Sequence, residues 1–224
     1  MDALPIADGF SALRRHMVQK QLRERGITDE RVLAAMERVP RHEFIPLEKR
    51  QHAYDDHPVV IGEGQTISQP FMVASMVQAA EIKPTDVVVE IGTGSGYQSA
   101  ILAELAGKVY SVERFASLAE SARAVLERLH YNNVVIAVGD GSTGFPAQDA
   151  PMTFDAIIVS AAAPGIPASL AQQLKEGGRM VIPIGTLDEQ LLHVVRRQQG
   201  FLVDQRLYGC KFVPLVGTQG FQPR

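Results

Sequence analysis

One segment constrains the fold of this chain more than any other: the apolar run and glycine-rich turn of residues 87–97. Three consecutive valines and Ile91 predict a buried β-strand, since β-branched side chains pack well on a pleated sheet. The glycines that follow stand at alternate positions, Gly92, Gly94 and Gly96. A helical pattern over residues 98–105 comes next. A strand, a glycine turn and a helix in this order predict the opening of a nucleotide-binding βαβ unit.

The spacing of these glycines separates two kinds of nucleotide-binding turn. A dinucleotide-binding turn has the pattern G-x-G-x-x-G, in which backbone N–H groups at a helix N-terminus hold a pyrophosphate. Here the third glycine comes one residue early, and Glu90 stands two residues before the first glycine, where its charge would repel phosphate. The acid suits S-adenosylmethionine, which carries an ammonium and a sulfonium group. The turn resembles that of class I methyltransferases; a glycine-rich turn of some other α/β domain is the alternative.

Composition narrows the class of protein. With 224 residues, 46% of them hydrophobic, the chain is long enough for one domain with a substantial core. A net charge of −3 provides no basic field for nucleic acid. The N-terminus lacks a signal-peptide pattern, and no apolar run approaches a membrane span. The single cysteine, Cys210, excludes an internal disulfide. We therefore expect a cytoplasmic enzyme with neither a membrane nor a nucleic-acid partner.

Helices are predicted before the central strand. An amphipathic helix over residues 8–26 ends at Gly26, and a second helix, capped by Thr28, stops at Pro40. An irregular stretch then runs to Pro70, a helix-start residue that begins a buried helix. Long ordered loops of this kind are usually functional.

Strands and helices alternate after the glycine turn. Strands are predicted over residues 108–113, 134–138, 154–159 and 179–183, with further candidates at 189–197 and 201–208. This alternation predicts an α/β fold, a doubly wound, mostly parallel, Rossmann-like sheet with N-terminal helices and a C-terminal antiparallel addition. We expect one domain, 1–224, in three parts: residues 1–80 with helices and an active-site loop, 81–185 as the cofactor-binding core, and 186–224 with strands lining the substrate site.

Acidic residues stand at the ends of three consecutive strands: Glu90, Glu113 and Asp140. Open α/β sheets bind ligands beyond the carboxyl ends of their strands. Glu113 comes 21 residues after Gly92 in the sequence. In nucleotide-binding βαβ units, an acid at this sequence separation accepts both hydroxyls of a ribose. Asp140 and Gly141 suit adenine contacts, with a plain turn as the alternative. The acids therefore predict a nucleoside site at one edge of the sheet.

The chain as a whole resembles the protein-L-isoaspartate O-methyltransferases, which repair damaged aspartyl residues. The likeness rests on Val-Pro-Arg at residues 39–41 with Phe44, the loop 62–70, the glycine turn, and three later motifs at residues 139–141, 154–157 and 212–215. The segment Gln65 to Pro70 and the Val-Pro-Leu at residues 213–215 distinguish this family from other class I methyltransferases. A loop about one residue longer before residue 150 and Val216 depart from the family pattern.

The resemblance implies roles for particular residues. The methionine part of the cofactor would be held by Glu90, Gly92, Thr93, Gly94 and Gly96, the ribose by Glu113, and the adenine by Asp140 with Gly141. The substrate peptide would lie along Thr66, Ile67, Ser68, Val213, Pro214 and Leu215. Ser68 would be the catalytic hydroxyl beside the methyl donor; a helix cap before Pro70 is its structural alternative.

The implied reaction is methyl esterification of the free carboxylate of L-isoaspartyl residues, with S-adenosyl-L-homocysteine as the other product. A carboxylate is ionised at neutral pH and needs no general base. The six histidines lack H-E-x-x-H spacing, so no metal site is expected; His57 lines the pocket or is a plain loop residue.

Two alternatives stay open for the function. One is a class I methyltransferase with another substrate, although residues 160–164 lack the Asn/Asp-Pro-Pro-aromatic motif of nucleic-acid amine methylation. The other is a non-catalytic cofactor-binding protein of the same fold. We expect isoaspartyl proteins as partners and a monomeric chain.

Overall fold

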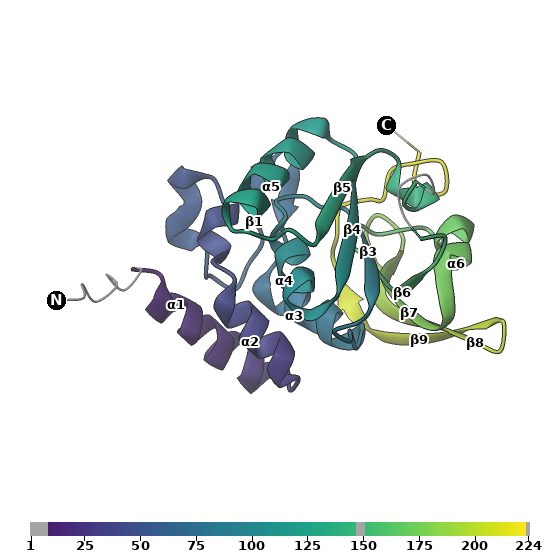
Figure 1. The fold of residues 1–224 in the computed structure, drawn as a ribbon, viewed down its shortest axis with the longest axis horizontal. Coiled ribbons are helices and arrows are strands. Elements are labelled where there is room, and N and C mark those ends of the chain that lie inside the picture. The colour runs from purple at the N-terminus through teal and green to yellow at the C-terminus, as the bar shows by residue number, and fades with distance from the viewer. Residues whose placement is uncertain (1–8, 147–150, 223–224) are drawn as a thin grey trace.

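A seven-stranded sheet forms the centre of the computed structural model, which describes residues 9–146 and 151–222. The strand order is β5-β4-β3-β6-β7-β8-β9; the first five strands are parallel, and β8 and β9 are antiparallel additions (Figure 1). The strands are β3 (Val87–Ile91), β4 (Lys108–Glu113), β5 (Val134–Val138), β6 (Phe154–Val159), β7 (Leu174–Gly185), β8 (Gln190–Gln198) and β9 (Phe201–Cys210). This topology confirms the predicted fold class.

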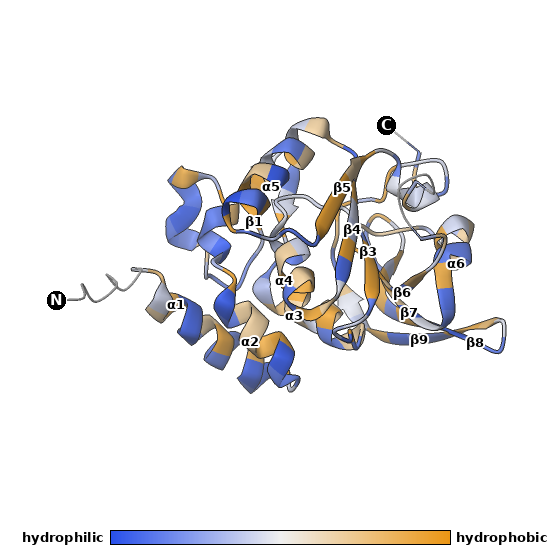
Figure 2. Ribbon diagram, viewed as in Figure 1, coloured by the Kyte–Doolittle hydropathy of each residue, from blue (hydrophilic) through white to orange (hydrophobic). Residues whose placement is uncertain are grey.

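Helices cover both faces of the sheet and complete two hydrophobic cores. They are α1 (Ser11–His16), α2 (Glu30–Arg38), α3 (Pro70–Ala79), α4 (Tyr97–Leu105), α5 (Ala116–Arg128) and α6 (Ala168–Gln173). Helices α2 to α5 lie on one side and α6 on the other (Figure 1). The central strands are hydrophobic, whereas α1, α2 and α5 carry hydrophilic residues on their outward sides (Figure 2). Among the described residues, no helix has the length and apolar character needed to cross a bilayer.

The N-terminal helix differs from the regular helix predicted over residues 8–26. Helix α1 continues as π-helix over Met17–Leu22 and as a 3-10 turn over Arg23–Arg25, and it ends as predicted at Gly26, whose φ is 99°. Residue 8 lies outside the described ranges. The cap of α2 is Asp29, so the prediction of Thr28 is wrong. The Asp29 carboxylate accepts two backbone N–H groups of the first turn, and the N–H of Thr28 donates to Gln78 instead.

The stretch predicted as irregular, residues 40–70, contains short regular elements. Two 3-10 helices, Arg41–Phe44 and Leu47–His52, precede an antiparallel hairpin of β1 (Val59–Gly62) and β2 (Gln65–Ile67). Both residues of its turn, Glu63 and Gly64, have positive φ, as a tight hairpin turn requires. Strands of three or four residues are too short for their alternation to stand out in the sequence, which is why the hairpin was not predicted.

Strand β7 begins five residues before the start predicted from the sequence and ahead of the glycine pair Gly177 and Gly178, because α6 already ends at Gln173. Gly177, with φ of 75°, lies inside the strand. The register between β6 and β7 shifts between Phe154 and Ala156, so the glycines sit in an irregular part of the ladder.

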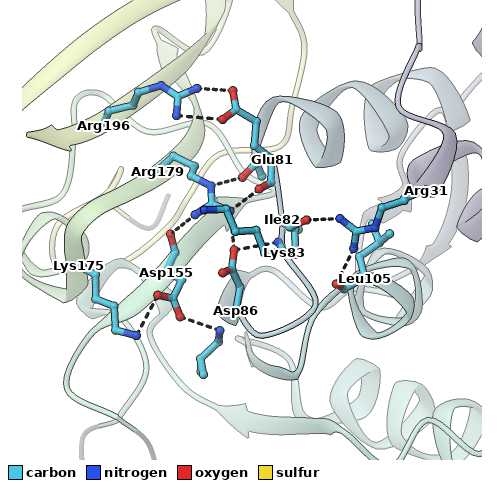
Figure 3. A network of polar contacts seen from close by, with 12 residues as sticks. Arg31, Glu81, Ile82, Lys83, Asp86, Leu105, Asp155, Lys175, Arg179 and Arg196 are labelled. Atoms are coloured by element: carbon cyan, nitrogen blue, oxygen red, sulfur yellow. Dashed lines mark hydrogen bonds and ion pairs between the residues drawn. The ribbon is translucent and has the colours of Figure 1, made fainter.

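A polar network joins the segments that precede the parallel strands (Figure 3). Arg179 donates to the carbonyls of Ala80 and Glu81 and to the carboxylate of Asp86, and both partners of this ion pair are buried. Asp155 accepts the N–H of Val87, the first residue of β3. This network lies at the amino ends of β3 and β6. The network therefore occupies the amino ends of these strands and leaves their carboxyl ends free for a binding site.

Candidate active site

A cavity opens at the carboxyl ends of the parallel strands, as expected for an open α/β sheet. It combines a loop before α3, the glycine turn after β3, the end of β4, and a C-terminal segment. Its lining residues are Gly64, Gln65, Thr66, Ile67, Ser68, Val73, Ile91, Gly92, Thr93, Gly94, Ser95, Tyr97, Gln98, Val112, Glu113, Arg114, Phe115, Gly141, Ser160, Ala161, Val213, Pro214, Leu215 and Val216. The cavity thus joins residues from all three predicted parts of the chain.

The glycine turn has a backbone that other residues rarely adopt. Gly92, Gly94 and Gly96 have φ values of 94°, 54° and 86°. Gly96 is the N-cap of α4, and a Cβ there would lie 3.1 Å from the Cβ of Ala122 on α5. The third glycine therefore lets two helices pack closely, whereas the first two line the cavity.

The backbone N–H groups of the three glycines are used inside the protein. Gly92 donates to the carbonyl of Val112 at 2.8 Å, Gly96 to that of Thr93 at 2.9 Å, and Gly94 to the Glu113 carboxylate at 2.8 Å. These amides are not available to a pyrophosphate, and a carboxylate lies beside them. The turn therefore fits a cofactor without phosphate, which agrees with the interpretation of its sequence.

Glu113 places its carboxylate in the cavity at the end of β4. Its Oε2 accepts the N–H of Gly94 at 2.8 Å and its Oε1 accepts the N–H of Phe115 at 3.0 Å. The side chain is 5% exposed. Each oxygen retains a second acceptor site, so the carboxylate can receive two further hydroxyl donors. This geometry suits the predicted ribose contact.

Glu90 lies beneath the cavity and is fully buried, so it does not line the site. Its carboxylate accepts from Gln98 Nε2 at 2.9 Å, from Ser111 Oγ at 2.8 Å, and from Ser99 Oγ. Burial raises the pKa of Glu90 to about 7, against the opposing effect of these hydrogen bonds. Gln98 also donates to Ser160 Oγ at 2.8 Å. In this structure Glu90 is connected to the cavity only indirectly, by its hydrogen bond with the lining residue Gln98.

Asp140 also lies behind the cavity wall, whereas Gly141 lines it. Oδ1 of Asp140 accepts the N–H and hydroxyl of Ser142, and Oδ2 accepts the N–H and hydroxyl of Thr218, all at 2.6–2.9 Å. Partial burial would raise its pKa, but these donors outweigh it and lower the pKa. Because the acceptor sites of the carboxylate are filled, a direct contact of Asp140 with adenine conflicts with this geometry.

Ser68 lines the cavity one residue before the cap of α3. The N-cap residue is Gln69, and no side chain makes a capping hydrogen bond. Ser68 therefore does not cap this helix. The carbonyl of Ser68 accepts from Nη2 of the buried Arg41 at 2.8 Å. The loop therefore positions the Ser68 side chain at the cavity by a bond to its backbone.

The C-terminal segment Val213 to Val216 lines the cavity together with the active-site loop. The carbonyl of Val213 accepts the N–H of Ala162 at 2.8 Å, and the N–H of Leu215 donates to the carbonyl of Ala162 at 2.7 Å. These two backbone groups are not available to a bound peptide. Hydrogen bonding of a peptide along this segment must therefore use other groups, such as the carbonyl of Pro214.

The cavity collects most of the residues predicted for the site. Of the cofactor, substrate and catalytic residues predicted from the sequence, all line it except Glu90, Gly96 and Asp140. His57 is exposed and outside the lining. Sequence reasoning missed Gln98, Ser160, Arg114 and Phe115, although each directly follows a predicted strand or turn and so carried a positional signal. The structure thus shows where the predicted site residues lie, and the roles assigned to them from the sequence stay predictions.

Comparison with known proteins identifies the family. The family model described as protein-L-isoaspartate(D-aspartate) O-methyltransferase matches residues 13–220. A protein-L-isoaspartate O-methyltransferase of Koribacter versatilis is 52% identical over 223 residues, which cover 100% of this chain and 99% of the relative. One of Petrotoga mobilis is 50% identical over 213 residues, which cover 95% and 99%. The chain belongs to the protein-L-isoaspartate(D-aspartate) O-methyltransferase family.

Solved structures of this family share the fold. A protein-L-isoaspartate O-methyltransferase superposes with a TM-score of 0.81 at 30% identity, covering 92% of this chain and 67% of the other. A structure from Plasmodium falciparum, described as a putative protein-L-isoaspartate O-methyltransferase in complex with S-adenosyl-L-homocysteine, has a TM-score of 0.77 at 27% identity, covering 89% and 96%. The family membership and the class I methyltransferase fold predicted from the motifs are confirmed.

Proposed function

We propose that this chain transfers the methyl group of S-adenosylmethionine to the free carboxylate of L-isoaspartyl residues in proteins and peptides. The observation that carries the proposal is the single cavity in which Glu113 and the glycine turn face the loop of Ser68. Membership of the protein-L-isoaspartate(D-aspartate) O-methyltransferase family supports the same activity.

The residues around the cavity divide into subsites for the cofactor. Gly92, Thr93 and Gly94 would hold its methionine part, with Glu90 acting from below through Gln98. Glu113 would accept the ribose hydroxyls, and Gly141 would lie against the adenine. Asp140 would support the adenine subsite from behind by fixing Ser142, the residue after Gly141, and would fix the C-terminal segment through Thr218. When bound, S-adenosylmethionine supplies an electrophilic methyl group on a sulfonium centre.

The chain's task in the reaction is alignment. The substrate carboxylate has an ordinary pKa near 4, so its oxygen is already a nucleophile at neutral pH. Among the described residues, those that line the cavity include no histidine or lysine, and none is needed as a base. Ser68 would donate its hydroxyl to one carboxylate oxygen and so direct the other toward the methyl carbon. Holding the reactants in this geometry and excluding water supply the rate enhancement.

The ester product explains the repair. The neighbouring amide nitrogen attacks the ester carbonyl, methanol leaves, and a succinimide ring closes. Water then opens the ring, partly to normal aspartate, without further help from the protein. The peptide would bind along Thr66 and Ile67 of the loop and along the segment Val213 to Leu215, which line the same cavity. As expected from the sequence, we place the activity in the cytoplasm and in a monomeric chain.

A labelling experiment tests the proposal. The protein is incubated with methyl-labelled S-adenosylmethionine and two peptides that differ only in isoaspartyl versus aspartyl at one position. Base-labile label on the isoaspartyl peptide alone is the expected result, and Ser68→Ala should reduce it strongly while cofactor binding persists. Label on a different substrate class would indicate another methyltransferase. Cofactor binding without any turnover would indicate a non-catalytic protein of the same fold.

A further inference from the structure

A turn outside the cavity gathers two histidines and one aspartate on the surface. The turn joins the 3-10 helix Leu47–His52 to β1. Donor atoms of His52, Asp55 and His57 all lie within 4.8 Å of one another. Oδ2 of Asp55 is 2.8 Å from His52 Nδ1 and 3.5 Å from His57 Nε2. The methyltransferase reaction proposed above uses none of these three side chains.

We propose that His52, Asp55 and His57 form a binding site for a divalent transition-metal ion of the Zn²⁺ class. Nitrogen and oxygen ligands bind Zn²⁺ at about 2.0–2.2 Å, which puts neighbouring ligand atoms roughly 3–3.5 Å apart. The two separations measured from Asp55 are close to this range, so small side-chain rotations would bring the three donors around one ion. Two imidazoles and one carboxylate favour Zn²⁺, Ni²⁺ or Cu²⁺ over Mg²⁺ or Ca²⁺.

The hydrogen bond at His57 favours metal binding, whereas His52 must exchange a proton for the ion. Nδ1 of His57 lies 3.0 Å from the carbonyl of Pro58, which can only accept, so that nitrogen carries the proton. The lone pair of His57 is therefore on Nε2, the atom that faces Asp55. Second-shell carbonyls commonly orient metal-binding histidines in this way. At His52, the amide nitrogen of Gln51 donates to Nε2 at 3.1 Å, and Nδ1 carries the proton that it donates to Asp55 at 2.8 Å. An ion bound at Nδ1 would replace this proton, which can move to Nε2 if the Gln51 amide turns to present its oxygen.

The backbone fixes the spacing of the ligands while leaving the site open. The N–H of Asp55 donates to the carbonyl of His52 at 3.2 Å, and the N–H of His57 to that of Asp55 at 2.9 Å. The three side chains are 52%, 49% and 54% exposed, so an ion can enter and keep water on its remaining positions. The neighbouring carboxylate of Asp56 is paired with Arg25 and does not compete.

This proposal revises the expectation of no metal site. That expectation depends on the helical H-E-x-x-H spacing, whereas the present spacing is H-x-x-D-x-H on a turn. The same turn is adjacent to the active-site loop, because the carbonyl of Asp56 accepts from Gln69, the residue after Ser68. A bound ion would cross-link the turn and stabilise the segment against which Gln69 rests.

Calorimetric titration of the chelator-treated full chain with ZnCl₂ tests the site. We expect one Zn²⁺ to bind, His52→Gln and His57→Gln to weaken binding about tenfold or more, and MgCl₂ to produce no binding. His16→Gln is the matched control, since His16 is also exposed but lies on α1. Zn²⁺ should raise the melting temperature of the wild type and of the His16 variant, and not that of the His57 variant.

Two results would overturn the proposal. One is a wild-type chain that binds no Zn²⁺ under these conditions. The other is binding that survives unchanged in both cluster variants, which would place the ion elsewhere, for example at Cys210. Melting curves without metal show whether each variant folds. Because both histidines are exposed, we expect the variants to fold as the wild type does.

Discussion

The guanidinium of Arg41 donates to the backbone carbonyl of Ser68 at 2.8 Å, so a fully buried cation holds the loop at the proposed methyl-transfer site. Its Nε donates to the carbonyl of Ala53 at 2.7 Å, and its centre lies 4.8 Å from the ring of Tyr97. Burial lowers the pKa of Arg41 to about 10, which leaves it charged at neutral pH. The active-site loop is thus fixed from inside the protein.

Replacing Arg41 should therefore lower kcat/KM by more than the accompanying loss of folding stability can explain. Arg41→Met removes both carbonyl contacts and frees the loop, and a misplacement of about 1 Å can cost about 100-fold in kcat/KM. Arg31→Met is the control, because Arg31 also donates to two carbonyls, those of Ile82 and Leu105, which precede β3 and β4 and so lie at the amino ends of these strands (Figure 3). Steady-state kinetics on an isoaspartyl peptide and melting curves compare the two. Equal kinetic losses in both variants would contradict the role of Arg41.

Glu113→Gln should weaken cofactor binding. The amide has one acceptor oxygen in place of two, so one of the N–H donors of Gly94 and Phe115 loses its partner. Charge-assisted hydrogen bonds contribute about 1.5–3 kcal/mol, which corresponds to roughly 10- to 100-fold in affinity. Calorimetric titration with S-adenosyl-L-homocysteine measures the change. Glu120→Gln on the exposed face of α5 is the control, and equal affinities in all three proteins would remove Glu113 from the ribose subsite.

Glu90 should make stability depend on pH. Its folded-state pKa of about 7 lies above the ordinary 4.5, so the folded protein holds this proton more tightly than the unfolded chain. The resulting stability is complete below pH 4.5 and is lost as the pH rises through 7, a total of about 3 kcal/mol. Urea unfolding of the wild type and of Glu90→Gln at pH 5, 6, 7 and 8 measures this. The free energy of unfolding of the wild type should fall relative to the variant over this range; parallel profiles would show that Glu90 titrates normally.

Asp140 and Thr218 should act on the peptide site through the C-terminal segment. Thr218→Val removes one hydrogen bond to Asp140, at 2.8 Å, and leaves the bond from its own N–H. A loss of about 1 kcal/mol in ordering this segment would raise KM for the peptide severalfold. Thr218→Val should leave the affinity for S-adenosyl-L-homocysteine unchanged, because the bonds from Ser142 to Asp140 remain. If Thr218→Val has no effect on KM while Asp140→Asn weakens cofactor affinity, Asp140 serves the adenine subsite and not the peptide site.

The central part of the fold could be predicted because local chemistry and tertiary structure agree there. The valines of β3 favour an extended strand, and the glycines after it tolerate the positive φ values that the turn requires; the structure shows both. Short elements were missed where local signals are weak. The β1–β2 hairpin has too few residues for its alternation to stand out, and Asp29 and Thr28 are both good helix caps.

Spacing and residue type determine that this chain forms a mostly parallel α/β sheet with a phosphate-free cofactor turn, because backbone conformation and strand pairing are short-range properties. The side-chain contacts of the acids depend on residues far away in the chain. Glu90 is buried under Gln98 and Ser111, Asp140 is occupied by Thr218, and Arg41 reaches Ser68 across 27 positions. Only tertiary structure decides these pairings, because hydrogen bonds between distant segments form when packing brings their partners together. The positions of the residues in the sequence do not indicate which partners will meet.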